Sequence, residues 1–270
     1  MYVALNGNIV ISGINSRIDT KNLYPFKTFE GRSFEGRGGT PYITVWDKHG
    51  KPLYVDFIPG LADNTYGVSI DTNDNVYLMS PGTRIYNKKV YYHDQTGTLM
   101  KFPPKKGKIY STNKRILLKM DQKNYLKRDF DISNPSFGKA WVTGSEWMYG
   151  GVGWSGKNGG TCSCWNARFA MDYFNRSFAP EITRFSIAMI DSAGNLITRI
   201  GTYGNADAQG PNSKAPVGGD EVGLMYGAYL TTYTDKKLYI ADPGNQKIVS
   251  VTLGYHKEER LSLKKFKIKK

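Results

Sequence analysis

Short apolar or alternating runs separated by polar turn sequences make up most of the hydrophobic pattern of the chain. In four places such a run leads into Asp-x-x-Gly or Asp-x-x-Asn, and a second run follows. Aspartate accepts backbone N–H groups at the start of a type I turn, and glycine or asparagine tolerates the positive φ that ends it. The pattern therefore predicts four β-hairpins, at 42–53, 90–99, 116–126 and 185–196.

A second kind of strand pair, joined by a tight polar turn, lies at 3–12, 68–80 and 230–242. Combining the two kinds gives the order strand a, turn, strand b, connection, strand c, turn, strand d. This is one four-stranded antiparallel blade of a β-propeller. Because the unit repeats along the chain, the sequence predicts an all-β fold, a β-propeller with about four visible blades.

The segment Leu238-Tyr-Ile-Ala-Asp242-Pro-Gly-Asn245-Gln-Lys247-Ile248 resembles an NHL-type repeat, whose usual form is Gly-Asn-x-Tyr-Val-x-Asp followed by Asn-x-Arg-Ile. Lys247 stands where the family usually has arginine. Residues 66–80 match in part, and other segments match weakly. NHL-like rings more often have six blades, so the resemblance implies the C-terminal part of a larger ring that lacks N-terminal blades. A four-bladed ring closed by the C-terminus is the alternative.

The spacing of the hairpins predicts a single propeller domain over 1–270, with blades at approximately 1–58, 66–131, 139–201 and 228–266. The first three exceed the usual blade length of about 40 to 45 residues. The excess lies at 14–40, 81–114 and 151–183, each predicted to connect a b strand to its c strand. In a propeller, b–c and d–a connections leave the same face. We therefore expect long insertions over one mouth of the central channel, and function at that face. The hairpin near Asp94 either lies inside the second insertion or belongs to a fifth blade.

No run reaches the roughly 18 apolar residues of a membrane span. The N-terminal residues are predicted to form strand a of the first blade, and they lack a signal-peptide pattern. Proteins resembling this one are often exported by bacteria. The resemblance therefore favours an extracytoplasmic or secreted location as part of a longer chain.

The net charge of +14 is concentrated in two segments. Residues 101–128 contain ten Lys/Arg and one acid, and residues 257–270 contain seven Lys/Arg and two acids, which together carry the whole excess. Such segments either protect strand edges from aggregation or bind a polyanion, including nucleic acid. The alternation of Lys264–Lys270 is typical of an outer d strand.

Aromatic residues and glycines gather between 141 and 165. Flat indoles beside glycine-rich backbone are able to stack on sugars or bases, although they equally fit a buried packing role. The candidate ligand-binding aromatic residues are Trp147, Tyr149, Trp154 and Trp165.

The same region contains Cys162-Ser-Cys164-Trp-Asn-Ala-Arg168-Phe, followed by Asp172-Tyr-Phe and Arg176-Ser-Phe. It resembles an insertion in uncharacterised bacterial NHL-like propellers. Arg168, Asp172 and Arg176 recur at i, i+4 and i+8, so on a short helix they would form one salt-bridged row that clamps the insertion or contacts a ligand.

The two cysteines fit three roles: structural residues, half of a soft-metal site, or a redox pair. The partners needed for a metal would come from carboxylates or from His49, His93 and His256.

Related six-bladed propellers include metal-dependent lactonases and an amidating lyase with channel metals. That resemblance makes Asp71 and Asp242 metal candidates for Ca²⁺, Mg²⁺ or Zn²⁺, although Asp71 also leads into a tight turn. No nucleophile elbow, Ser/His/Asp set or phosphate loop is present. We therefore expect a non-catalytic binding module for a glycan, peptide or protein. A lactonase-like or lyase-like enzyme and a polyanion-binding protein are the alternatives.

Overall fold

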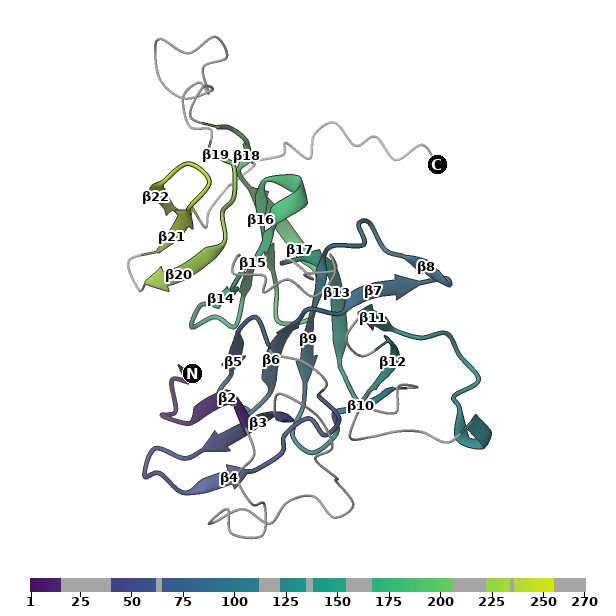
Figure 1. The fold of residues 1–270 in the computed structure, drawn as a ribbon. Coiled ribbons are helices and arrows are strands. Elements are labelled where there is room, and N and C mark those ends of the chain that lie inside the picture. The colour runs from purple at the N-terminus through teal and green to yellow at the C-terminus, as the bar shows by residue number, and fades with distance from the viewer. Residues whose placement is uncertain are drawn as a thin grey trace, which may run out of the picture.

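The computed structural model describes residues 1–15, 40–61, 65–111, 122–134, 138–153, 167–205, 222–233 and 236–254. These residues form an all-β propeller built from four-stranded antiparallel sheets (Figure 1). No helix in the described part of the chain is long and apolar enough to cross a membrane.

The first blade pairs four consecutive strands in the order in which they occur along the chain. They are β1 (Tyr2–Val3), β2 (Ile9–Asn15), β3 (Thr40–Trp46) and β4 (Pro52–Tyr54). The predicted a–b pair at 3–12 and c–d hairpin at 42–53 are confirmed. Asp47 caps the hairpin as expected, because its Oδ1 accepts the N–H groups of His49 and Lys51 at 2.9 and 2.8 Å.

The second blade does not follow the predicted boundaries. Its strands are β5 (Val68–Ile70), β6 (Val76–Ser80), β9 (Gly97–Phe102) and β13 (Trp147–Val152), in that order across the sheet. The hairpin predicted at 90–99 is therefore wrong, since β9 pairs with β6 and β13 instead. The segment 147–152, which falls within the predicted third blade at 139–201, is instead the outer strand of the second blade. The reason is that the insertion separating c from d in this blade is as long as a blade.

The b–c and c–d connections of the second blade together form a separate five-stranded sheet beside it, in the order β10-β12-β11-β7-β8 (Figure 1). Two strands, β7 (Thr83–Tyr86) and β8 (Lys89–Val90), come from the b–c connection. The other three come from the c–d connection: β10 (Lys108–Ser111), β11 (Ile132–Asn134) and β12 (Gly138–Thr143). A 3-10 helix, η2 (Gln122–Asn124), stands where the hairpin near Asp121 was expected, and Asp121 lies outside the described residues.

The third blade is compact and consists of β14 (Ala170–Met171), β15 (Ser177–Glu181), β16 (Ser186–Ile190) and β17 (Leu196–Ile200). The predicted hairpin at 185–196 is confirmed as its c–d turn. Its b–c link is short and contains the 3-10 helix η3 (Ile182–Arg184). The long connection at 153–169 therefore joins d of the second blade to a of the third, whereas we expected a b–c insertion. Both types of connection leave the same face of a propeller.

The fourth blade contributes three described strands, β20 (Tyr229–Tyr233), β21 (Lys237–Asp242) and β22 (Lys247–Thr252). The predicted a–b pair at 230–242 is confirmed. A short parallel pair, β18 (Thr202–Tyr203) and β19 (Gly223–Leu224), precedes it. The predicted outer strand at 264–270 lies outside the described residues.

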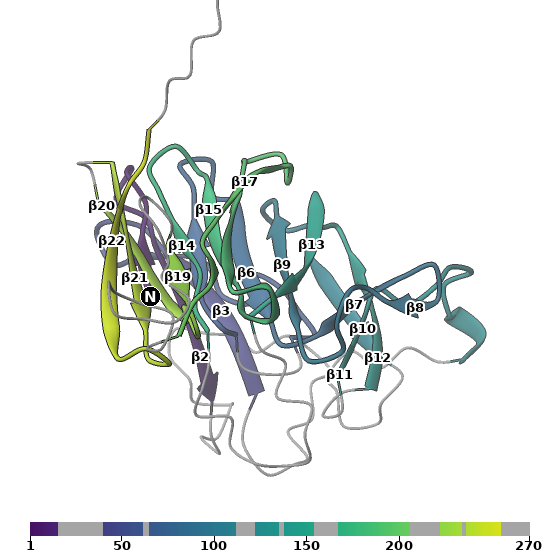
Figure 2. The same cartoon turned by 90° about the horizontal axis from the view of Figure 1, so that it is seen from above.

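Three hydrophobic clusters correspond to the three junctions between consecutive blades. Successive side chains of a strand point to opposite faces of its sheet. In the second blade, Leu78 and Phe102 therefore face the first blade, whereas Tyr77 and Leu99 face the third. A third cluster, which includes Ile187 and Leu238, joins the third and fourth blades. Seen from above, the sheets stand side by side like the blades of a fan (Figure 2).

In the described part of the chain, the fourth blade has one covered face and one exposed face. The residues of β6, β9, β15 and β16 are all buried, whereas exposure alternates along β22. Within the described ranges, no hydrophobic cluster joins the fourth blade to the first. Val3 is 52% exposed and Ile248 is 76% exposed on these blades.

The c–d turn of the third blade gives an expectation for the effect of pH on stability. Hydrogen bonds from the Asn195 side chain, and from backbone N–H groups of the turn, lower the pKa of Asp191 below its ordinary value. A carboxylate whose pKa falls on folding adds stability above its unfolded pKa of about 4, and that stability is lost as the pH falls through the folded pKa. Asp191→Asn should therefore reduce the steepness of acid destabilisation below about pH 4. Urea melts between pH 2 and 6 test this, and an unchanged slope would contradict it.

Candidate functional site

Trp147 fastens the second blade to the third and is not a free stacking platform. Its Nε1 donates to the Ser192 carbonyl oxygen at 3.0 Å, and its ring makes an edge contact with Tyr77 at 5.9 Å between centroids. Gly194 lies so close that a Cβ built on it would be 2.6 Å from Cγ of Trp147. The ring thus packs against the c–d turn of the neighbouring blade.

Tyr149 belongs to a buried polar cluster at the same junction. Its hydroxyl donates to Oε1 of Glu181 at 3.0 Å, and Ser186 donates to Oε2 at 3.0 Å. Arg199 completes the cluster by donating from Nε to Oε2 at 2.6 Å. Burial, and secondly the Glu181 charge, raises the pKa of Tyr149, so the phenol stays protonated. The hydrogen bond to Glu181 raises the pKa of Arg199. The cluster is therefore an ion pair within the third blade, to which the Tyr149 hydroxyl of the second blade is hydrogen-bonded.

Asp172 and Arg176 form a salt bridge, but the helical row predicted with Arg168 is wrong. Residues 172–176 are the turn between β14 and β15, and Oδ1 of Asp172 accepts the N–H groups of Phe174 and Arg176. Arg176 reaches Oδ2 through Nε at 2.8 Å and Nη2 at 2.5 Å. A strand–turn–strand brings i and i+4 together as a helix does. Arg168, four residues earlier, lies at the other end of the strand and lines a cavity.

The two carboxylates proposed as metal ligands are engaged by their own turns. Asp71 Oδ1 accepts the N–H groups of Asn73 and Asn75, both at 2.9 Å. Asp242 is fully buried and accepts from Met225 N, Tyr226 N and Asn245. No group of three or more His, Cys, Asp or Glu suited to a metal occurs among the described residues.

Four of the predicted candidates lie outside the described residues: Trp154, Cys162, Cys164 and Trp165. They belong to 154–166, which begins after Gly153 of the second blade and ends before Ala167 of the third. Their proposed roles in ligand binding, or in metal binding by the cysteines, stay predictions.

The basic segment 101–128 includes both exposed and buried cations. Lys105, Lys106 and Lys108 are exposed. Lys101 is only 8% exposed, and its Nζ pairs with Glu146 at 2.8 Å and donates to the Ser192 carbonyl oxygen at 3.2 Å. It therefore supports the blade junction at Trp147. Residues 257–270 lie outside the described part of the chain.

A surface rich in exposed tyrosines, which the sequence did not reveal, lies on the face that carries the b–c and d–a connections. We call it the tyrosine face. It runs from the β7–β8 hairpin across η3 to β18 and consists of Tyr86, Tyr91, Tyr92, Arg184, Phe185 and Tyr203. Tyr86, Tyr91, Tyr92 and Tyr203 are between 44% and 61% exposed.

Contacts between the two blades hold the tyrosine face in place. The Arg184 guanidinium stacks over the Tyr92 ring at 3.8 Å, and the Tyr92 hydroxyl donates to the Thr183 carbonyl oxygen at 3.3 Å. Phe185 meets Tyr203 edge to face at 4.7 Å. The underlying support is the Glu181 cluster, since Glu181 directly precedes η3.

The hairpin that carries the tyrosine face contains one signal that sequence reasoning missed. Its turn residues Asn87 and Lys88 both have positive φ, 48° and 64°. This is the type I′ conformation that best joins two twisted strands. Asparagine is common at the first central position of a type I′ turn. Glycine is usual at the second central position, so the lysine found there does not indicate a turn in the sequence.

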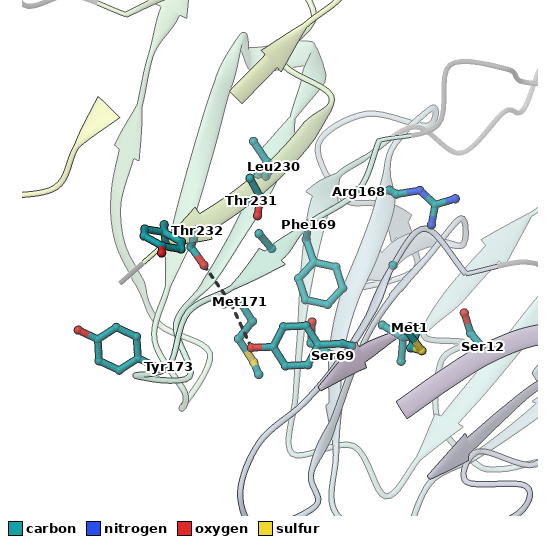
Figure 3. Close-up of a pocket in the computed structure, with 15 residues that line it drawn as sticks. Met1, Ser12, Ser69, Arg168, Phe169, Met171, Tyr173, Leu230, Thr231 and Thr232 are labelled. Carbon is teal, nitrogen blue, oxygen red and sulfur yellow. Dashed lines mark hydrogen bonds between the residues drawn. The ribbon is translucent and has the colours of Figure 1, made fainter. Parts of the chain in front are cut away.

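A cavity of about 410 Å³ lies between strands of several blades (Figure 3). It is lined by the innermost strands of all four blades, β1, β5, β14 and β20, and by Ser12, Gly67, Arg168, Phe169 and Tyr173. A cavity shared by four inner strands is the central channel expected of a propeller.

No protein-family model matches the sequence, and no curated protein matches it. Solved structures similar to this fold include virginiamycin B lyase from Staphylococcus aureus, with a TM-score of 0.29 and 11% identity over 91% of this chain and 74% of that chain. A streptogramin B lyase gives a TM-score of 0.30 and 13% identity over 91% of this chain and 70% of that chain. We transfer no residue role from similarity at this level.

Proposed function

We propose that this chain is a β-propeller binding module that recognises an acidic segment of a partner protein through the tyrosine face. The observation that carries the proposal is the rigid support of exposed tyrosines by neighbouring blades. Tyrosine and arginine are enriched at interfaces, and ordered side chains lose little entropy on binding. Here Arg184 is stacked and the β7–β8 hairpin is paired, so much of the surface is ordered before a partner arrives.

Charge favours an acidic partner. Lys88 and Lys89 form the exposed tip of the hairpin, and Arg184 lies between Tyr92 and the Glu181 carboxylate. The exposed acid nearest in sequence is Asp94. A partner with aspartate or glutamate beside an aromatic or aliphatic side chain would match the cations and the rings, and salt would weaken its binding.

The resemblance of 238–248 to an NHL-type repeat fits the same proposal. Asp242 and Asn245 hydrogen-bond to each other at 2.7 Å, and Lys247 donates to the Gly223 carbonyl oxygen at 2.9 Å. These contacts fasten strands b and c of the last blade to the loop before it. They support a scaffold role for the repeat residues, with recognition assigned to the connections.

The test uses a phage-displayed peptide library selected on the whole chain and counter-selected on a Tyr91→Ala/Tyr92→Ala variant. We expect peptides enriched in acidic residues, bound at least about tenfold more weakly by the double variant, because two ring contacts are lost. Fluorescence anisotropy at two salt concentrations measures the affinity. Tyr229→Ala, an exposed tyrosine on the fourth blade, is the matched control and should bind as the unmodified chain does.

Other outcomes separate the alternatives. Selected peptides that bind the double variant equally well would contradict the proposal. Binding on a glycan array that disappears in the same variant would identify a carbohydrate module instead. Retention on heparin that depends on Lys105 and Lys106, and not on Tyr91 and Tyr92, would favour the polyanion alternative.

A further inference from the structure

Polar and apolar side chains both line the central cavity, and Arg168, an exposed residue, is the one charged side chain among the described residues that line it. Phe169 and Met171 contribute from the third blade, and Val68 contributes from the second. Figure 3 shows the Phe169 ring between Met171 and Arg168, with Ser12 on the same side as Arg168. A small flat body in the cavity would therefore contact the part of Phe169 that is accessible, since this residue is 6% exposed, and would place a polar group toward Arg168.

Arg168 is fixed at its backbone and free at its side chain. Its N–H donates to the Ala228 carbonyl oxygen at 2.8 Å, and it forms a parallel bridge with Tyr229 of the fourth blade. Its guanidinium makes no ion pair or hydrogen bond with the described residues. The other described arginines each lie within 4 Å of a carboxylate: Arg84, Arg128, Arg176, Arg184 and Arg199. Among the described arginines, Arg168 is thus the one without a counter-ion in the described part of the chain.

No acidic side chain among the described lining residues offsets the positive charge of Arg168. None of the described residues that line the cavity is an aspartate or a glutamate. Asp172, beyond β14, is occupied by Arg176 and by two backbone N–H groups. Burial, and secondly the Asp172 charge, raises the pKa of Tyr2, so this lining phenol stays neutral. An anion that enters would meet one unpaired guanidinium, whose planar fork suits carboxylate or phosphate.

Phe169 is held in its position by close backbone packing. Gly67 has φ of +118°, a conformation that side chains rarely adopt, and a Cβ there would lie 2.9 Å from Cδ1 of Phe169. The Phe169 ring of the third blade is therefore held against Gly67 of the second blade.

We propose that the central cavity binds a small planar anion, with a carboxylate or phosphate on Arg168 and an aromatic body against Phe169. The proposal uses residues other than those of the tyrosine face. Either binding activity can fail while the other remains.

Isothermal titration with benzoate, phenyl phosphate, benzamide and inorganic phosphate tests the proposal on the whole chain. We expect benzoate or phenyl phosphate to bind, and the neutral isostere benzamide to bind at least about tenfold more weakly. Arg168→Ala should lower the affinity for the anions by about tenfold or more, with Arg168→Lys in between. Thr231→Phe, which fills the cavity without changing its charge, should also abolish binding. Lys106→Ala, an exposed cation elsewhere, should leave binding unchanged.

Each result decides the question. A preference for benzoate over phenyl phosphate, or the reverse, would identify the anionic group within the proposal. Equal binding of benzamide, equal binding of inorganic phosphate, or an affinity insensitive to Arg168→Ala would overturn it, as would the absence of binding by every probe.

Discussion

Replacing Arg199 by methionine should lower the free energy of unfolding by about 2 kcal/mol, below the range of about 3–5 kcal/mol for breaking a fully buried ion pair, because the Arg199 side chain is 37% exposed. The cost comes from Glu181, which is only 1% exposed and would keep its charge without its main partner. Arg184 stays near, since its Nε lies 3.9 Å from Oε1 of Glu181, which also limits the expected loss. Urea denaturation near neutral pH measures it.

A double-variant cycle separates the ion pair from simple loss of packing. Glu181→Gln retains the shape of the side chain and removes the charge that Arg199 neutralises. Arg199→Met combined with Glu181→Gln should therefore be more stable than Arg199→Met alone, because no unpaired buried charge remains. Strictly additive losses would contradict the assignment of Glu181 and Arg199 as a coupled pair within the third blade.

Replacing Asp242 by alanine should lower the free energy of unfolding by about 2–4 kcal/mol, because several buried donors would lose one acceptor. Asp242 is fully buried, and its two oxygens accept from Met225 N at 2.9 Å, Tyr226 N at 2.8 Å and Asn245 Nδ2 at 2.7 Å. These bonds join the last blade to the loop that precedes it. Asp129→Ala, an exposed aspartate, is the control and should change stability by less than about 0.5 kcal/mol.

The same variants distinguish the structural role of Asp242 from a metal-binding role. Elemental analysis of protein purified without chelator gives the content of Ca, Mg and Zn. If Asp242 is only a structural acceptor, Asp242→Asn changes stability without changing the metal content. About one equivalent of metal that is lost in Asp242→Asn and retained in Cys162→Ser would overturn that assignment and favour a lactonase-like channel metal. Metal lost with Cys162→Ser would instead place it in the 154–166 segment.

Local hairpins could be predicted because their determinants are adjacent in sequence. Aspartate, a short turn and flanking alternating residues specify the turns at Asp47, Asp71 and Asp191, and all three have the expected cap bonds. The four-blade organisation follows from repeating such units. The hairpin expected at Asp94 failed because the same local signal leads there into strands that pair with distant partners.

The candidate site also shows this difference between local features, which the sequence predicts, and contacts between distant segments, which it does not. Residue types at 147–176 marked a region of interest, but Trp147 and Tyr149 are engaged in blade packing and Arg168 lies in the cavity. The tyrosine face could not be predicted, because it combines residues from the b–c link of one blade and the b–c and d–a links of the next. None of these segments carries a distinctive motif alone.

The sequence by itself determined the class of fold, the local turns and the hydrophobic faces of individual strands. Each depends on residues a few positions apart and on period-two alternation. Only the tertiary structure decided which strand completes the second blade, which carboxylates are buried and which arginine stays unpaired. These properties depend on contacts between segments tens of residues apart, such as β9 with β13 and Tyr149 with Glu181. Their energies come from burial, and burial exists only once the blades have packed.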